Sequence, residues 1–193
     1  MRAPRGFTLI ELLVVIGVIA VLVAIVFPAY SAIRRSQKIK RTEQLVQTLA
    51  TAAASYANDY GMYPPADYAA AGPNRGNRSL ITLLDARGGQ SWPYLPSPFY
   101  DGGQHIEGDL FLDEWGRPVI YFDSSTMTDE TSHTYAIEGD TAVSPARGDD
   151  GYVNFGRCQV WSVGPNGRNE GGLGLGTKEA DDIANFDLRP VED

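Results

Sequence analysis

Near its N-terminus the chain carries an unbroken apolar run with polar residues on both sides. The run extends from Phe7 to Phe27, reads FTLIELLVVIGVIAVLVAIVF, and contains Glu11 as its only charged residue. At about 1.5 Å per residue, a helix of this length spans roughly 31 Å, the thickness of the hydrocarbon core of a bilayer. The apolar region of a secretory signal peptide is shorter, about 7–15 residues. The pattern therefore predicts a membrane-spanning helix behind a short basic leader, MRAPRG.

After Pro28 the pattern becomes that of an amphipathic helix. Apolar side chains recur every three or four residues and predict one stripe that packs on a sheet. The members of this stripe are Leu45, Leu49, Ala53, Tyr56 and Tyr60. Gly61 and the Pro64-Pro65 pair are typical helix stop signals. We therefore expect one long helix over residues 7–60.

C-terminal to this helix, turn residues are frequent and periodic segments are short. Residues 61–108 are rich in Gly, Pro and Asn and are predicted to be mainly surface loop, with one short helix at Ser79–Ala86. Later segments rich in β-branched and aromatic residues predict strands. These segments are Pro118–Asp123, Thr134–Ile137 and Tyr152–Val163. The predicted fold class is α+β: a long N-terminal helix, membrane-spanning over residues 7–28, packs its amphipathic back half, 29–60, on a small antiparallel β-sheet in a globular part, 61–193.

The charge of the chain is divided unevenly. The formal net charge is −8, but residues 1–60 hold seven Lys/Arg against three Asp/Glu, and residues 61–193 hold nine against twenty-one. An acidic globular part argues against nucleic acid as a partner, because phosphate contacts need clustered Lys or Arg. It leaves room for a cation site. Cys158 is the only cysteine, which excludes an intramolecular disulfide.

Glu11 stands at an unusual position, four residues inside the apolar run. A carboxylate in an apolar span is costly and normally has a partner. If the chain is cut after Gly6, the new amine of Phe7 lies one helical turn from Glu11 on the same face. The carboxylate then neutralises an amine of its own subunit or of a neighbour. In the alternative interpretation, a plain membrane anchor, Glu11 is incidental and Gly6 is only a flexible residue.

The segment Gly6-Phe7-Thr8-Leu9-Ile10-Glu11, followed by the apolar run, resembles the cleavage and methylation motif of type IV pilins and type II secretion pseudopilins. The resemblance implies that a prepilin peptidase cuts after Gly6, removes the leader 1–6 and methylates Phe7. It implies that Glu11 guides assembly into a helical filament. It also implies a bacterial inner-membrane protein with a single pass and a periplasmic C-terminal domain.

Three further phrases resemble the major pseudopilin, the G-type subunit, of type II secretion. They are YANDYGMYPP at 56–65, DEWGRP at 113–118, and VWSVGPNG at 160–167 with Asp181-Asp182-Ile183 behind it. In that family the last loop binds calcium, a cation that takes oxygen ligands. The resemblance implies calcium ligands from the side chains of Asn166, Asp181 and Asp182 and from the carbonyl groups of Val163 and Arg168.

The chain departs from the family pattern at several positions. Asn166 stands where aspartate is usual, which removes one negative charge from the predicted calcium site. The glycine-rich run Gly171–Gly176 lengthens the loop and makes Glu170 and Glu179 alternative ligands. Glu114 stands where proline is common. Without the resemblance, adjacent aspartates more often form a solvated turn or the start of a helix, so these interpretations stay open beside the cation site.

The sequence lacks the motifs of a catalytic site. No HExxH or CxxC pattern occurs, and His105 and His133 do not accompany a serine–glycine nucleophile pattern. Cys158 lies in a predicted strand and is expected to pack as a small hydrophobic residue. Core or turn packing is also expected of the tryptophans, which are Trp92, Trp115 and Trp161. We therefore predict no enzyme activity.

The resemblance implies a structural subunit of a type II secretion pseudopilus, a periplasmic filament that drives protein export. Its partners are then further copies of itself, the prepilin peptidase, the minor pseudopilins and the inner-membrane platform. The first alternative is a type IV pilin for adhesion, motility or DNA uptake. Those pilins often close a C-terminal loop with two cysteines, and this chain has one. The second alternative is an anchored binding domain that never assembles and keeps residues 1–6.

Overall fold

The structure is a computed structural model that describes most of the chain. It covers residues 8–69, 72–84, 94–95, 105–128, 133–137, 142–148, 151–172 and 181–186, without the side chains of residues 25–29. Two compact units follow one another along the chain, Met1–Lys38 and Ile39–Asp193. Each unit is therefore described by itself.

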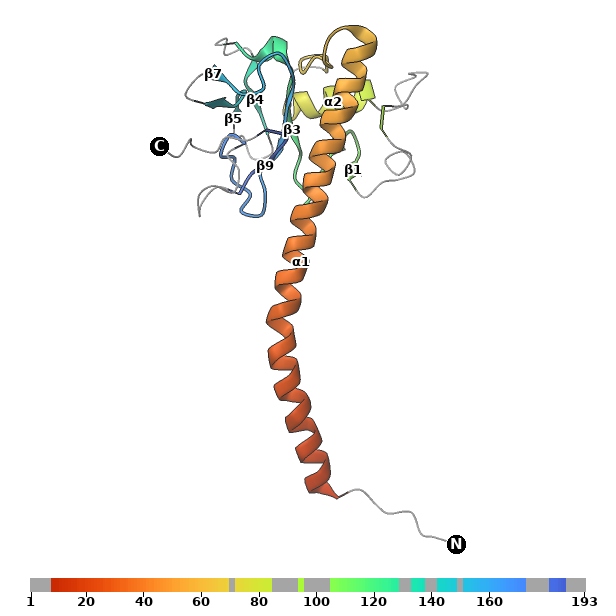
Figure 1. The fold of residues 1–193 in the computed structure, drawn as a ribbon, viewed down its shortest axis with the longest axis vertical. Helices are drawn as coiled ribbons and strands as arrows, with labels where there is room; N and C mark the ends of the chain where they lie inside the picture. The colour runs from red at the N-terminus through yellow and green to blue at the C-terminus, as the bar shows by residue number, and fades with distance from the viewer. Residues whose placement is uncertain are drawn as a thin grey trace. The chain divides into compact units, whose positions relative to one another are not determined.

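One long helix, α1, runs from Leu9 to Tyr60 and contributes to both units (Figure 1). It confirms the long N-terminal helix predicted from the apolar run and the amphipathic stripe. The helix continues through Pro28, so this proline does not end it. It ends before Gly61, whose φ of +75° is the left-handed conformation that glycine provides at helix C-termini.

The back half of α1 supplies one side of the core of the second unit. Its most deeply buried apolar residues, each no more than 2 % exposed, are Leu45, Val46, Leu49, Ala52 and Ala53. The predicted stripe is thus confirmed over most of its length, and Tyr56 is buried as well. Its last member, Tyr60, is 53 % exposed and stacks on Tyr56, with 4.4 Å between the ring centroids. The prediction is therefore wrong at Tyr60, because the stripe leaves the core in the last turn.

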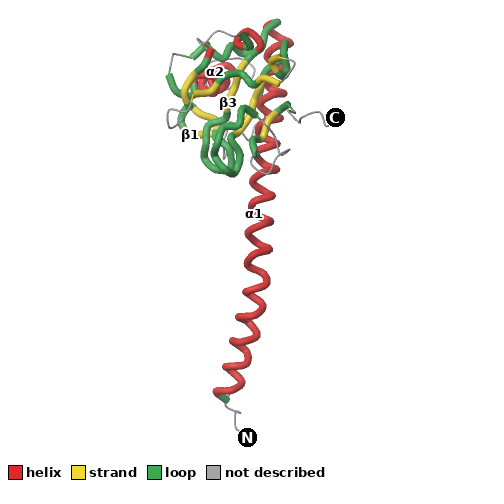
Figure 2. Tube along the Cα trace, turned by 90° about the vertical axis from the view of Figure 1, so that its left-hand side faces the viewer, coloured by secondary structure: helices red, strands yellow, loops and turns green. Residues whose placement is uncertain are grey.

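The second unit contains a three-stranded antiparallel sheet. Strands are drawn in yellow in Figure 2. The strands of this sheet follow in the order β3 (Ile120–Phe122), β8 (Gln159–Ser162) and β9 (Ile183–Ala184). Tyr121 pairs with Val160 across the first two strands. This sheet confirms the α+β fold class.

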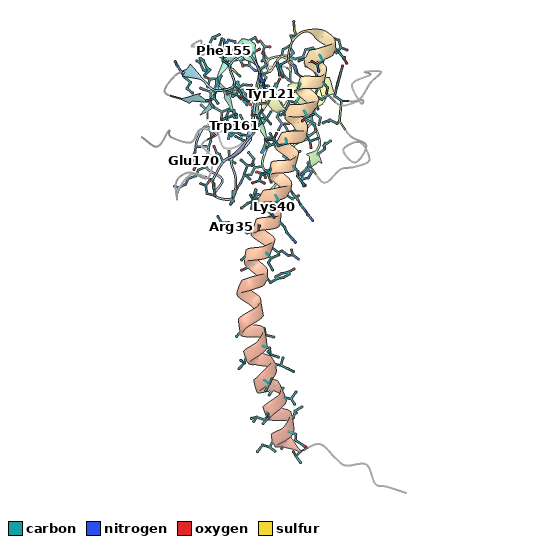
Figure 3. The ribbon with its side chains drawn as sticks, in the orientation of Figure 1. Arg35, Lys40, Tyr121, Phe155, Trp161 and Glu170 are labelled. Atoms are coloured by element: carbon teal, nitrogen blue, oxygen red, sulfur yellow. The ribbon has the colours of Figure 1, made fainter. Side chains whose placement is uncertain are left out.

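Both faces of the sheet are covered. Tyr121 and Val160 belong to the cluster that includes the buried residues of α1. Ile120, Phe122 and Trp161 belong to a second cluster on the other face (Figure 3). All four residues of β8 are buried, as expected for a strand that is covered on both faces.

Shorter strand pairs lie outside this sheet. They are the antiparallel pairs β1 (Ile106–Glu107) with β2 (Leu110–Phe111), β4 (Tyr135–Ala136) with β5 (Ala142–Val143), and β6 (Arg147–Gly148) with β7 (Gly151–Tyr152). A 3-10 turn at Ser124–Thr126 follows β3. The predicted strands Pro118–Asp123 and Thr134–Ile137 are found as the shorter β3 and β4.

The predicted strand Tyr152–Val163 is wrong in its first half. Between β7 and β8 the chain makes a turn in which Asn154 and Gly156 have φ values of +52° and +82°. The amide of Arg157 donates to the carbonyl oxygen of Asn154 at 2.9 Å and closes this turn. Left-handed residues cannot continue a pleated strand, so the strand begins only at Gln159.

The second helix, α2 (Arg75–Leu84), begins four residues before the predicted Ser79–Ala86. Gly76 in its first turn lies so close to β3 that a Cβ atom there would be 2.2 Å from the carbonyl oxygen of Tyr121. A glycine weakens the helix signal in the sequence, which explains the late predicted start. Here the absence of a side chain lets α2 pack directly on the sheet.

Asn77 joins α2 to the strands from a fully buried position. Its side-chain amide donates to the carbonyl oxygens of Phe111 at 2.9 Å and Val119 at 2.7 Å, and its carbonyl oxygen accepts from the amide of Phe111 at 2.8 Å. These bonds use all the donors of the side chain, as a buried amide requires. Asn77 therefore holds α2 in register with β2 and the start of β3.

Candidate functional site

The predicted processing site lies at the border of the described structure. Gly6 and Phe7 fall outside the described residues, so the predicted cleavage and methylation remain predictions. The first described residue, Thr8, precedes α1 directly and occupies the position of its N-cap. The geometry of the motif is therefore described from Thr8 onward.

Thr8 and Glu11 form a reciprocal hydrogen-bonded cap at the start of α1. The backbone amide and the hydroxyl of Thr8 both donate to Oε2 of Glu11, at 2.8 and 2.7 Å. In return the amide of Glu11 donates to the hydroxyl oxygen of Thr8 at 3.3 Å. Such a capping box satisfies amide groups that have no partner within the helix. A threonine followed by a glutamate three positions later is a known signature of it, and the sequence interpretation overlooked this signal.

The first unit exposes apolar side chains along the described part of α1. From Leu9 to Val23, its large apolar residues are between 46 % and 87 % exposed. They surround the helix, whereas a helix on a protein surface has one apolar face. Lipid or other apolar helices are the usual surroundings of such a helix.

Within the described residues, none of the helices combines the length and the apolar character that a membrane span needs.

The predicted cation loop is built from two segments that the structure brings together. Residues 163–172 follow β8, and Asp181 and Asp182 lead into β9. Gly164 lies directly against the second segment, since a Cβ atom there would be 2.0 Å from the carbonyl oxygen of Asp181. The left-handed backbone of Gly164, with φ of +58°, also favours glycine. Pairing of β8 with β9 therefore places the two segments side by side.

Asn166 contacts residues of both segments. Its backbone amide donates to the carboxylate of Asp181, at 3.1 Å from Oδ2. Its side-chain oxygen accepts from the amide of Arg168 at 2.6 Å, and its side-chain amide donates to Oε1 of Glu170 at 2.8 Å. The structure thus brings Asn166, Arg168 and Asp181 together and adds Glu170, while calcium binding by these residues stays a prediction.

Asp182 is the most deeply buried residue of the predicted ligand set, at 1 % exposure. Its Oδ2 accepts from the amides of Glu170 at 3.0 Å and Gly172 at 2.8 Å. Its Oδ1 is buried and has no hydrogen-bond partner among the described residues. Buried polar atoms normally have a partner, so Oδ1 is suited to a ligand that supplies positive charge.

Glu170 places a second carboxyl group beside Asp182. Burial, and after it the interaction with Glu170, raise the pKa of Asp182 to about 8. Oε2 of Glu170 is also buried without a hydrogen-bond partner in the described part of the chain. The described residues hold no group of three or more His, Cys, Asp or Glu side chains that suits a metal ion. Asp182 and Glu170 offer carboxyl oxygens and Asn166 offers an amide oxygen, and oxygens of these kinds are the ligands that calcium takes.

The turn before β3 supports this loop. The guanidinium of Arg117 donates to the carbonyl oxygen of Gly164. A Cβ atom on Gly167 would be 2.6 Å from Cζ of Arg117, so the guanidinium packs directly on the loop backbone. Asp113 accepts from the amide of Arg117 at 2.9 Å and from the hydroxyl of Ser162 at 2.6 Å. The two sequence phrases that contain these residues are therefore in contact, a link that their separation in the sequence concealed.

Glu114, where the sequence departs from the family pattern, lies beside Arg41 and His105. Its Oε2 lies 3.7 Å from Nη1 of Arg41, and its Oε1 lies 3.8 Å from Nε2 of His105. Its amide donates to the hydroxyl of Thr42 at 3.3 Å. The departure therefore adds a side chain that ties the turn before β3 to α1.

The remaining candidates pack in the core or lie at its edge. Cys158 is 2 % exposed and belongs to the cluster around α1, which confirms its predicted packing role. Burial raises the pKa of its thiol to about 12. Trp161 is fully buried, and Trp115 packs against the first cluster. Trp92 lies outside the described residues.

Comparison with known proteins adds one match, at the N-terminus. Residues 1–27 match the family model of the prokaryotic N-terminal methylation motif. The matched stretch contains Gly6, Phe7, the Thr8–Glu11 cap and the apolar run. No curated protein and no solved structure matches the chain. The motif indicates a type IV pilin-like protein that a prepilin peptidase processes for assembly into a filament.

Proposed function

We propose that this chain is a structural subunit of a type II secretion pseudopilus. The single observation that carries the proposal is the methylation motif at residues 1–27, on a helix whose apolar side chains from Leu9 to Val23 are exposed. The sequence phrases shared with the major pseudopilin favour the pseudopilus over other filaments. The precursor would sit in the bacterial inner membrane with its C-terminal unit in the periplasm.

Processing prepares the helix for assembly. The peptidase cuts after Gly6, which frees the amine of Phe7 as the new N-terminus, and then methylates this amine. Glu11 lies one helical turn away and carries the opposite charge. In the filament core its carboxylate would pair with the amine of a neighbouring subunit, because an unpaired charge among apolar helices is costly. The apolar residues of α1 would then be covered by the helices of sister subunits.

Calcium would stabilise the second unit through the loop that follows β8. The proposed ligands are side-chain oxygens of Asn166, Asp181 and Asp182 and carbonyl oxygens of Val163 and Arg168. The buried Oδ1 of Asp182 supports this proposal. A ligand that binds only the folded state, present at a hundredfold excess over Kd, adds about 2.7 kcal/mol, which raises Tm by roughly 5–10 °C. The full-length protein in detergent should therefore melt higher in calcium than in chelator.

The experiment that tests the function removes the gene and examines both filaments and export. The pseudopilus proposal expects loss of protein secretion without loss of surface pili, and recovery of secretion when the gene is restored. Normal secretion together with missing surface pili would support the alternative, a type IV pilin. A single cysteine argues against the usual disulfide of those pilins.

A strain that restores the gene with Gly6→Leu provides a matched control. The substitution blocks cleavage while it leaves the apolar run and the second unit unchanged. A filament subunit should then fail to restore secretion although the protein accumulates in the membrane. Full restoration by the uncleaved protein would instead point to an anchored binding domain.

A further inference from the structure

We propose that Glu170 is a further charged ligand of the calcium loop, beside Asp182, and that Asn166 positions it. This inference rests on the proposed calcium binding by the same loop. It makes Glu170 a ligand in addition to the set that the family resemblance implies, whereas the sequence offered Glu170 only as an alternative ligand. It also explains how the loop keeps its charge although Asn166 itself is neutral.

Each of the two carboxyl groups has one oxygen fixed and one oxygen left for a ligand. Oδ2 of Asp182 is held by the amides of Glu170 and Gly172 at 3.0 and 2.8 Å. Oε1 of Glu170 is held by the side-chain amide of Asn166 at 2.8 Å. The other oxygens, Oδ1 of Asp182 and Oε2 of Glu170, are both buried without a hydrogen-bond partner in the described structure. Two carboxylates held in this way are suited to bind one divalent cation between them.

Burial makes this arrangement unfavourable unless a positive charge is added. Asp182 is 1 % exposed, and Glu170 is half-buried beside it. Two neighbouring carboxyl groups in such a place have lost hydration, and their free oxygens favour a ligand that carries positive charge. A calcium ion supplies that charge, since its ligands are charged and neutral oxygens.

Asn166, whose side-chain oxygen is itself a proposed ligand, also positions Glu170. Its side-chain amide holds Glu170, while its side-chain oxygen is engaged by the amide of Arg168 at 2.6 Å. Its backbone amide holds the carboxylate of Asp181 at 3.1 Å. One short residue thus orients the carboxylates of both segments toward the loop.

The test compares Glu170→Gln with the matched control Glu107→Gln, which makes the same charge change at an exposed residue of β1. Full-length protein in detergent is melted in EGTA and in a calcium series. We expect Glu170→Gln to weaken calcium binding on the order of tenfold or more, because one charged ligand is lost. In EGTA its Tm should equal or exceed that of the wild type, because the substitution removes a like charge beside Asp182. Glu107→Gln should respond to calcium as the wild type does.

Terbium luminescence gives a second, direct reading of the site. Trp161 donates its indole N–H to Asn169 at 3.0 Å, next to Glu170, and can sensitise a bound lanthanide ion. Wild-type and Glu107→Gln protein should give a terbium signal that calcium competes away. Glu170→Gln should lose most of it, and Glu170→Asp, which keeps the charge on a shorter side chain, should lose less.

The outcomes separate the two proposals. A wild-type protein that responds to neither ion contradicts calcium binding altogether. A wild-type response that Glu170→Gln retains at full affinity overturns the role of Glu170 and leaves calcium binding intact. An equal fall in the Tm of Glu170→Gln in EGTA and in calcium would show a purely structural role, which also overturns the inference.

Discussion

Glu11 accepts hydrogen bonds from both the backbone amide and the hydroxyl of Thr8, at 2.8 and 2.7 Å. The carboxylate that the family resemblance assigns to filament assembly therefore also caps the first turn of α1. These two roles make different demands. Capping needs a hydrogen-bond acceptor, which glutamine also provides, whereas pairing with an amine needs a negative charge.

Glu11→Gln and Thr8→Val separate these roles. Glu11→Gln keeps an acceptor for the cap and removes the charge, so we expect insertion and cleavage to continue while filament assembly is lost. Thr8→Val removes the hydroxyl of the cap and keeps the charge, so we expect filaments to form. Filament yield is measured by shearing and immunoblotting at matched expression. Wild-type yield from Glu11→Gln would show that the charge is dispensable and that Glu11 acts as a cap only.

Asn77 should be among the most sensitive residues of the second unit. Asn77→Ala removes three buried hydrogen bonds and leaves groups of Phe111 and Val119 unsatisfied. We expect the free energy of unfolding to fall by about 3 kcal/mol. Urea denaturation of the full-length protein in detergent, followed by tryptophan fluorescence, measures this change. Thr82→Ala, on the exposed side of the same helix, should change it by less than about 0.5 kcal/mol, and equal effects of the two variants would contradict the assigned role.

Cys158 should be unreactive in the folded protein. It is 2 % exposed, and burial raises its pKa from 9.0 to about 12, so the thiolate is scarce at neutral pH. We expect a thiol reagent to label native protein only at the rate of unfolding, and one thiol per chain to react in urea. The neutral thiol also stabilises the fold below pH 9, and this contribution declines as pH rises from 9 toward 12. Rapid labelling under native conditions would contradict the packing role.

Asn166→Asp tests the electrostatics of the loop. The substitution replaces the amide that donates to Glu170 with a third carboxylate near Glu170 and Asp181. We expect Tm in chelator to fall, because like charges meet without compensation, and the gain in Tm on adding calcium to grow. Thermal melting of full-length protein in detergent measures both. A variant whose Tm is the same in chelator and in calcium would argue against a cation at this loop.

The hydrophobic patterns that extend over many residues predicted the fold class and the long helix. They did not predict where the shorter elements α2 and β8 begin. The apolar run and the stripe from Leu45 to Ala53 each extend over several turns of α1. The helix prediction therefore rests on many residues, and one exceptional residue does not change it. The early start of α2 was missed because Gly76 has a low helix propensity. A glycine is needed there because the backbone of α2 lies against β3. The strand predicted from Tyr152 was too long because Asn154 and Gly156 take left-handed backbone conformations.

The candidate sites show the same division. The three-residue spacing of Thr8 and Glu11 indicates a capping box, so this feature could have been predicted from the sequence. The contact between Glu170 and Asp182 depends on the pairing of β8 with β9, so no local pattern indicates it. Arg117 reaches Gly164 in the same way, across residues far apart in the sequence. Tertiary contacts therefore determine the loop, while local sequence determines the N-terminal motif.

The mature N-terminus tests the central claim most directly. Intact-mass and N-terminal peptide measurements on protein from its native envelope should show a chain that begins at Phe7 and carries one methyl group on its amine. The same measurement in cells without prepilin peptidase should show the full precursor, including Met1–Gly6. A native chain that keeps these residues while the peptidase is active would contradict processing, and with it the proposal that this protein is a filament subunit.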